Sequence, residues 1–258
     1  MNGAAIRLDG VSVRFQLPHE RRDTLKEQAI AWLRGQRGMM EVRALDDVDL
    51  EVRRGEVFGV VGHNGAGKST LLRLVAQVLR PTRGRVRVRG RLAPLLDLGT
   101  GFHPELTGRE NVVMAGTMLG FSRLEMERRM DRIVAFSGLG AFIDTPARAY
   151  STGMWSRLGF AIATDARPDI LVVDEAISVG DAAFQSRCER RIAELVAGGA
   201  TALIVSHDPN LVATVCHRAV LLERGRVAAL GTPAAVLAAY RDSAPREACG
   251  APVLSLSE

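Results

Sequence analysis

The stretch GHNGAGKST at positions 62–70 restricts the fold of this chain more than any other feature of its sequence. An apolar run, EVFGVV (56–61), precedes it, and a helical pattern, STLLRLVAQVL (69–79), follows it. Glycines at this spacing let a backbone wrap closely around an anion, so that its N–H groups point inward. The order of strand, loop and helix predicts an α/β fold with the loop at the end of a buried strand.

The same residues satisfy the pattern G-x-x-x-x-G-K-[ST], which in this context indicates a nucleotide phosphate site rather than a glycine-rich turn that binds nothing. The helix that follows adds the positive end of its dipole. Lys68 would place its charge at the β- and γ-phosphates, and the Ser69 hydroxyl would ligate Mg²⁺. His63 occupies a variable position and is expected to face solvent. The predicted ATP-binding residues of the loop are Gly62, Asn64, Gly65, Ala66, Gly67, Lys68, Ser69 and Thr70.

Two later apolar runs end in polar side chains that could reach the same phosphates. ILVVD (170–174) would carry Asp174 to the sheet edge, where it would hold Mg²⁺ through water. Glu175 follows at once and is the predicted base that orients and deprotonates the attacking water. ALIVS (202–206) would deliver His207, which could bond the γ-phosphate or hold the water. The simpler alternatives are an acidic helix cap and a structural histidine.

The apolar runs, together with AVLLE (219–223), predict a mostly parallel sheet covered on both faces. The early segments AIRLDGVSVRF (5–15) and EVRALDDVDLEVRRGEV (41–57) alternate over short stretches, which indicates antiparallel strands. RGRVRVRG (83–90) alternates arginine and valine, and an edge strand with a solvated basic face is favoured over a DNA-binding ribbon. The segment 106–148, with SRLEMERRMDRIVAFSGL (122–139), indicates a helical insertion.

The predicted organisation is one domain with a long insertion near its start. Within TLKEQAIAWLRG (24–35), Leu25, Ala29, Trp32 and Leu33 share one helical face. That face could pack on its own domain or lie against a membrane or a partner. The predicted units are a domain over 1–241, an insertion over 16–40, a helical subdomain over about 98–160 and a tail over 242–258.

The composition of the chain limits the classes of partner but does not identify one of them. The net charge of +5 suits anionic partners, including nucleic acid, anionic lipid and nucleotide phosphates. The three cysteines lie far apart, which argues against a zinc site or a disulfide framework. The chain lacks a secretory signal pattern and any uncharged apolar run near the about 20 residues that span a bilayer.

Taken together, these motifs resemble the ATP-binding cassette family over almost the whole chain. In that family two cassettes pair head to tail, and a signature turn of one closes over the ATP held by the other. YSTGM (150–154) stands where that turn belongs, although the commonest form is L-S-G-G-Q. The resemblance implies that Ser151 and Gly153 contact the γ-phosphate across the interface. A plain helix N-cap at Ser151 or Thr152 is compatible with this role.

The resemblance implies further contacts. Phe15 stands where the family has an aromatic side chain that stacks on adenine. Asp181, in SVGD (178–181), would contact the opposite subunit. The loop LLDLGTGFHPELTGREN (95–111) lacks the usual glutamine that senses Mg²⁺, and Asp97 stands nearest that place as a candidate metal group.

The loop 95–111, the signature segment and VVDEAISVGDAAFQ (172–185) are similar to one branch of the family. Its members are the nucleotide-binding subunits of exporters of O-antigen, capsule, teichoic acid or galactan chains. This implies a homodimer with ATP and Mg²⁺, on the cytoplasmic face of the inner membrane, beside an integral membrane permease that handles the glycan. The branch has an extra helix toward the permease, which residues 24–34 fit. Because the chain ends soon after 234–241, we expect no appended carbohydrate-binding domain.

Two other functions compete with glycan export. The basic charge would suit a cassette ATPase that acts on nucleic acid or ribosomes. Against it, the translation-type members carry two cassettes and the chromosome-type members carry long coiled coils, so we expect no nucleic-acid partner. A regulatory module that binds ATP without hydrolysis is disfavoured, because Lys68, Asp174, Glu175 and His207 are all present.

Overall fold

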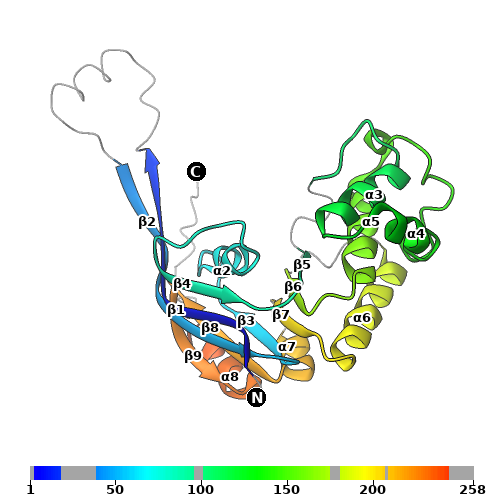
Figure 1. Cartoon of the computed structure of the whole chain (residues 1–258). Coiled ribbons are helices and arrows are strands. Elements are labelled where there is room, and N and C mark those ends of the chain that lie inside the picture. The colour runs from blue at the N-terminus through cyan, green and yellow to red at the C-terminus, as the bar shows by residue number, and fades with distance from the viewer. Residues whose placement is uncertain (1–2, 19–38, 96–100, 175–180, 207–208, 244–258) are drawn as a thin grey trace, which may run out of the picture.

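The computed structural model describes residues 3–18, 39–95, 101–174, 181–206 and 209–243 of the chain. Its elements form two sheets and a helical lobe (Figure 1), which confirms the predicted α/β class. The strands are β1 (Ala4–Pro18), β2 (Met39–Arg53), β3 (Val57–Val61), β4 (Arg83–Val88), β5 (Leu92–Leu95), β6 (Ile170–Val173), β7 (Thr201–Val205), β8 (Arg218–Glu223) and β9 (Arg226–Gly231). The helices are α2 (Lys68–Val75), α3 (Gly108–Met118), α4 (Arg123–Ser137), α5 (Thr152–Asp165), α6 (Ala182–Ala197), α7 (Pro209–Val215) and α8 (Pro233–Ser243), with a 3-10 turn η1 (Ala147–Ala149).

The larger sheet carries the strands that were predicted to be buried. Its order is β5-β6-β7-β3-β8-β9, and every pairing is parallel except that of β8 with β9. Every residue of β3, β6 and β7 is buried, as expected for a sheet covered on both faces. The four predicted strands at 56–61, 170–174, 202–206 and 219–223 are therefore confirmed.

The smaller sheet is antiparallel, with the order β2-β1-β4, which confirms the prediction for the early segments. β4 is an edge strand, and its arginines are exposed while Val86 and Val88 pack against the core. Arg87 forms an ion pair with Asp9 of β1 at 3.6 Å. The interpretation of residues 83–90 as an edge strand with a solvated basic face is confirmed.

Helix α2 lies between the two sheets. Leu71, Leu72, Leu74 and Val75 of α2 are buried in one hydrophobic cluster with side chains of β1, β2, β3 and β8. A second cluster fills the opposite face of the larger sheet, where α6, α7 and α8 contribute Phe184, Val212 and Val236. Because both faces of the central strands β3, β6 and β7 are covered, polar side chains on them can reach solvent only at the strand ends.

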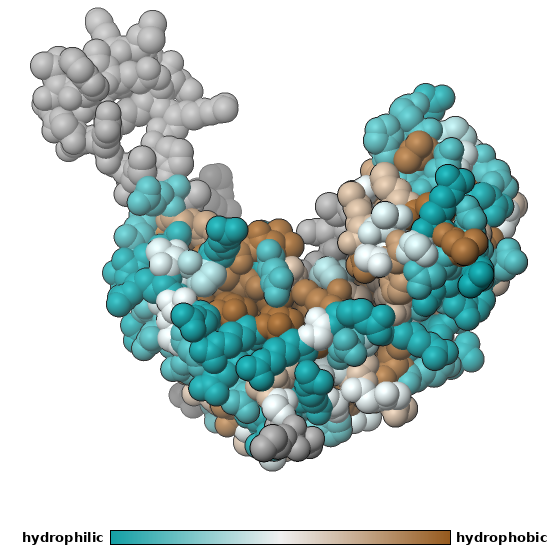
Figure 2. All heavy atoms as spheres, viewed as in Figure 1, coloured by the Kyte–Doolittle hydropathy of each residue, from teal (hydrophilic) through white to brown (hydrophobic). Residues whose placement is uncertain are grey.

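Helices α3, α4 and α5 form a lobe of their own to one side of the sheets (Figure 1). Capping boxes fix two of the helix starts, with Thr107 and Glu110 at α3 and Ser122 and Glu125 at α4. Figure 2 shows the molecule hollowed between this lobe and the sheets, with hydrophobic atoms on the floor of the hollow. Over the described residues, no helix combines the length and the apolar character needed to cross a bilayer. The predicted helix at 24–35 lies outside the described residues.

Candidate functional site

The loop between β3 and α2 is pressed so closely against its neighbours that two positions require glycine. A Cβ atom at Gly62 would clash with the carbonyl oxygen of Leu222 on β8. A Cβ atom at Gly67 would clash with the carbonyl oxygen of Ala44 on β2, and Gly67 has a φ of +106°. Gly65 has no neighbouring atom within 4 Å of its Cβ position. The glycines thus fix the two ends of the loop and leave its middle open.

The start of α2 is built to receive an anion. Gly67 caps the helix without a side-chain hydrogen bond, and the first turn contains no acidic residue. The N-terminus of α2 therefore presents the positive end of the helix dipole with no carboxylate of its own turn to neutralise it. Lys68 is 8% exposed, and its Nζ donates to the carbonyl oxygens of Gly62 at 2.6 Å and His63 at 3.1 Å. A buried ammonium beside a helix N-terminus fits the phosphates of ATP.

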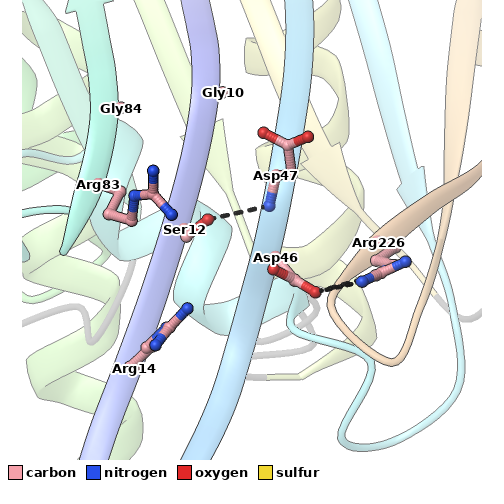
Figure 3. A pocket seen from close by; sticks show the side chains of 8 residues that line it. All are labelled: Gly10, Ser12, Arg14, Asp46, Asp47, Arg83, Gly84 and Arg226. Atoms are coloured by element: carbon pink, nitrogen blue, oxygen red, sulfur yellow. Dashed lines mark hydrogen bonds and ion pairs between the residues drawn. The ribbon is translucent and has the colours of Figure 1, made fainter.

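The loop is also supported from behind by the turn between β8 and β9. Gly225 donates its N–H to the Ala66 carbonyl oxygen at 2.9 Å, and Asp46 donates its N–H to the Gly225 carbonyl oxygen at 2.8 Å. The Arg226 guanidinium bonds the Asp46 carboxylate (Figure 3) and holds the pKa of Asp46 below its usual value. These two residues help to line a cavity of about 440 Å³ with Gly10, Ser12, Arg14, Asp47, Arg83 and Gly84.

Strand register places Asp174 at the same edge of the sheet as the phosphate loop. Val173 of β6 pairs with Ile204 of β7, and Val205 of β7 pairs with Val60 of β3. Asp174 therefore follows its strand at the level where β3 ends, with β7 between them. Over the described ranges no group of three or more His, Cys, Asp or Glu side chains could hold a metal. A Mg²⁺ site built from one carboxylate, a hydroxyl, phosphates and water needs no such group.

The three other predicted catalytic or metal-binding residues, Glu175, His207 and Asp97, lie outside the described residues. Phe15 is described on β1, where it pairs with Val42 of β2 and is 37% exposed. Its contact with adenine stays a prediction.

The signature segment places its bulky side chains inward. Ser151 is the N-cap of α5, and its Oγ accepts from the Met154 N–H at 3.3 Å, so the expected N-cap is confirmed. Tyr150 is buried and donates its hydroxyl to the Phe142 carbonyl oxygen at 2.8 Å. The Trp155 ring stacks on Phe102 with 5.4 Å between centroids. The apolar residues of this turn thus anchor it in the lobe, while Ser151 stays exposed at its surface.

Asp181 is held within its own chain. Its carboxylate caps α6 by accepting from the Phe184 N–H at 2.8 Å, and this bond lowers the pKa of Asp181. The same carboxylate forms an ion pair with Arg157 of α5 at 2.9 Å. The contact of Asp181 with an opposite subunit stays a prediction.

The prediction that His63 faces solvent is confirmed only in part, because the residue is half-buried. Its ring lies 4.7 Å from the ring of Tyr240 on α8, and its Nε2 atom is buried. No local signal in the sequence connects the two residues, because the contact depends on how α8 packs on the larger sheet. One edge of the His63 ring therefore faces α8, while part of the residue stays exposed.

Comparisons with known proteins agree with this geometry. Residues 45–178, more than half of the chain, match the family described as ABC transporter. The chain belongs to the ABC transporter family. The "O-antigen export system ATP-binding protein RfbB" of Klebsiella pneumoniae is 46% identical over 200 residues, which cover 78% of this chain and 81% of RfbB.

Other relatives of this ABC protein are longer than the matched region. The "ABC transporter protein AbcA" of Aeromonas salmonicida is 50% identical over 77% of this chain and 64% of AbcA. The "Teichoic acids export ATP-binding protein TagH" of Shouchella clausii is 39% identical over 91% of this chain and 64% of TagH. The chain thus spans less than two thirds of the length of both proteins.

A solved structure with the same fold is the dimeric ATP-binding cassette MJ0796, described as a post-hydrolysis state bound to ADP and Pi. The TM-score is 0.70 at 21% identity, and the match covers 88% of this chain and 98% of that chain. This likeness confirms the predicted α/β fold, in which the loop at 62–70 follows a central parallel strand.

Proposed function

We propose that this chain is the ATP-hydrolysing subunit of an ABC transporter that exports a polysaccharide or a lipid-linked glycan. The observation that carries the proposal is the phosphate loop at 62–70, tightly backed by β2 and β8, in a chain 46% identical to a protein named for O-antigen export. The name of the relative TagH, for teichoic acid export, supports the same class of substrate.

ATP would bind with its phosphates along the N–H groups of the loop and the first turn of α2. Lys68 would bond the β- and γ-phosphates from its buried position. Mg²⁺, when bound, would neutralise developing charge on the phosphates. Ser69 and Asp174 would hold it, with Asp97 as a further candidate. Glu175 would accept the proton of the attacking water, and His207 would hold that water or the γ-phosphate.

Hydrolysis would require two copies of the chain, paired head to tail. Ser151 and Gly153 at the start of α5 would complete the phosphate site of the other copy, because a helix N-terminus binds anions. Asp181 would contact the opposite copy, and Phe15 would stack on adenine in its own. The dimeric form of the cassette MJ0796 supports this arrangement.

Replacing Ser151 with arginine should block the ATP-dependent pairing of two copies. The bulky cation would occupy the exposed start of α5, where the γ-phosphate of the other copy would lie. The measurement is the molar mass by light scattering with ATP, in a background that does not hydrolyse it.

Ser122→Arg is the matched control, since it removes an equivalent N-cap from α4 in the same lobe. Each variant should lose about 1 kcal/mol of stability with its cap, but only Ser151→Arg should stay monomeric. If Ser151→Arg still formed the ATP-dependent dimer, the role assigned to the signature turn would be wrong.

The partner is an integral membrane permease, which would place this chain at the cytoplasmic face of the inner membrane.

The experiment that tests the proposed function is an affinity pull-down of the full chain from detergent-solubilised membranes of its own host. We expect a polytopic membrane protein, and we expect its loss when residues 24–34 are deleted. Recovery of soluble protein or nucleic acid alone would contradict glycan export.

A further inference from the structure

One side chain of the phosphate loop reaches a helix at the far end of the described chain. The centroids of the His63 and Tyr240 rings lie 4.7 Å apart, with 33° between the ring planes. Aromatic pairs at this distance attract each other beyond the area that they bury. Nε2 of His63 is buried, and no hydrogen-bond partner for it exists among the described residues. Ring packing is thus the main described contact of this side chain.

Tyr240 is a fixed platform rather than a mobile side chain. Val236 is fully buried and Leu237 is 7% exposed, one turn before Tyr240 on α8. Both side chains belong to the cluster on the α6–α8 face of the larger sheet, and Tyr240 packs against that cluster. The cluster includes side chains of β3 and β8, the strands that flank the loop. The Tyr240 ring is therefore held by the same sheet that carries the loop.

The outer part of the loop has few other side-chain anchors. Asn64 is exposed, and the Cβ position of Gly65 has open space around it. Backbone bonds close the turn, since the His63 carbonyl oxygen accepts the Ala66 N–H at 3.1 Å. The same carbonyl oxygen accepts from the Lys68 ammonium at 3.1 Å. A displacement of His63 would therefore shift both the turn and one acceptor of Lys68.

We propose that Tyr240 is a positioning residue for ATP binding, which acts by holding the His63 ring and so keeps the phosphate loop in its binding conformation. The inference rests on the proposed function of residues 62–70. Without the platform the loop samples other conformations, and ATP must then order it on binding. The free-energy cost of ordering the loop weakens the binding of the substrate and of the transition state equally. KM therefore rises while kcat stays nearly constant.

The test compares steady-state ATP hydrolysis by His63→Ala, Tyr240→Ala, Tyr240→Phe and the double alanine variant of the full chain. Each single alanine variant should raise KM about threefold to tenfold, in line with the strength of an aromatic pair. The KM of the double variant should not exceed that of the single variant with the higher KM, because both changes remove the same contact. Tyr240→Phe keeps the ring and should restore a low KM.

Asp242→Ala is the control, since this neighbouring residue on α8 is exposed and forms no described hydrogen bond or ion pair with the loop. It should keep the wild-type KM, and thermal unfolding of every variant checks that α8 stays docked. His63→Ala removes the contact without touching α8, so it remains informative if Tyr240→Ala unfolds.

Two failures are distinguishable in this experiment. If the wild-type chain neither binds nor hydrolyses ATP, the proposed function fails. If the wild type is active and both alanine variants keep its KM, or if their effects on KM multiply in the double variant, the positioning role of Tyr240 is wrong.

Discussion

Replacing Lys68 with alanine should abolish most ATP binding and nearly all ATP hydrolysis. The Lys68 ammonium is 8% exposed and is held on the carbonyl oxygens of Gly62 and His63, at the entrance to α2. A charge in a desolvated site interacts strongly with phosphate, and no other described lysine or arginine takes part in the loop's hydrogen bonds. Loss of such a preorganised donor costs about 10²–10³ in rate. Phosphate release and equilibrium ATP binding are the two measurements.

Arg73→Ala is the matched control for the charge, because Arg73 is exposed in the last turn of the same helix. We expect it to bind and hydrolyse ATP as the wild type does. Thermal unfolding in the absence of nucleotide tests whether Lys68→Ala keeps its fold. A folded Lys68→Ala variant with normal ATP binding would exclude the loop as the phosphate site.

The phosphate loop and the buried strands could be predicted because their signals are local. Glycines at 62 and 67 and the apolar run before them determine the backbone path over a few residues. The place of Asp174 also follows from local signals, since every strand of a parallel sheet ends at the same edge. The edge position of β4 followed from the alternation of arginine and valine.

The supports of the loop could not be predicted, because they come from distant parts of the chain. Gly67 needs its small size because of Ala44, and the Ala66 carbonyl oxygen is bonded by Gly225. Neither neighbour has a sequence pattern that connects it to the loop. The stack of His63 on Tyr240 depends on the docking of α8, which is a tertiary contact between surfaces of ordinary composition.

The unusual residues of the signature segment now have a structural reason. Met154 and Trp155 are bulky apolar residues in the first turn of α5, next to the exposed Ser151, which is unfavourable unless they pack inward. They do so, since both pack against the cluster of the helical lobe, and Trp155 stacks on Phe102 just before α3. Phe102 lies in the described segment that leads into α3. The segment that would contact ATP in a partner copy is therefore braced by residues just before α3.

Replacing Glu175 with glutamine should stop ATP turnover while leaving ATP binding intact. Glu175 directly follows Asp174, whose strand ends at the edge that carries the phosphate loop. Glutamine has nearly the same shape but cannot accept a proton from water, and loss of a general base costs about 10²–10⁴ in rate. If hydrolysis opens the proposed dimer, the variant should accumulate an ATP-bound dimer. Phosphate release and light scattering with ATP measure the two effects.

Glu189→Gln on α6 is the matched control, because it makes the same chemical change at an exposed site. It should hydrolyse ATP at the wild-type rate and form no lasting dimer.

Asp174→Asn distinguishes the proposed role of Asp174 from that of Glu175. Loss of a carboxylate that holds Mg²⁺ should lower turnover, and a higher Mg²⁺ concentration should restore part of it. Normal hydrolysis by Glu175→Gln would exclude Glu175 as the base. Loss of ATP binding together with hydrolysis would instead assign Glu175 to the binding of the nucleotide, and the trapped dimer would then be absent.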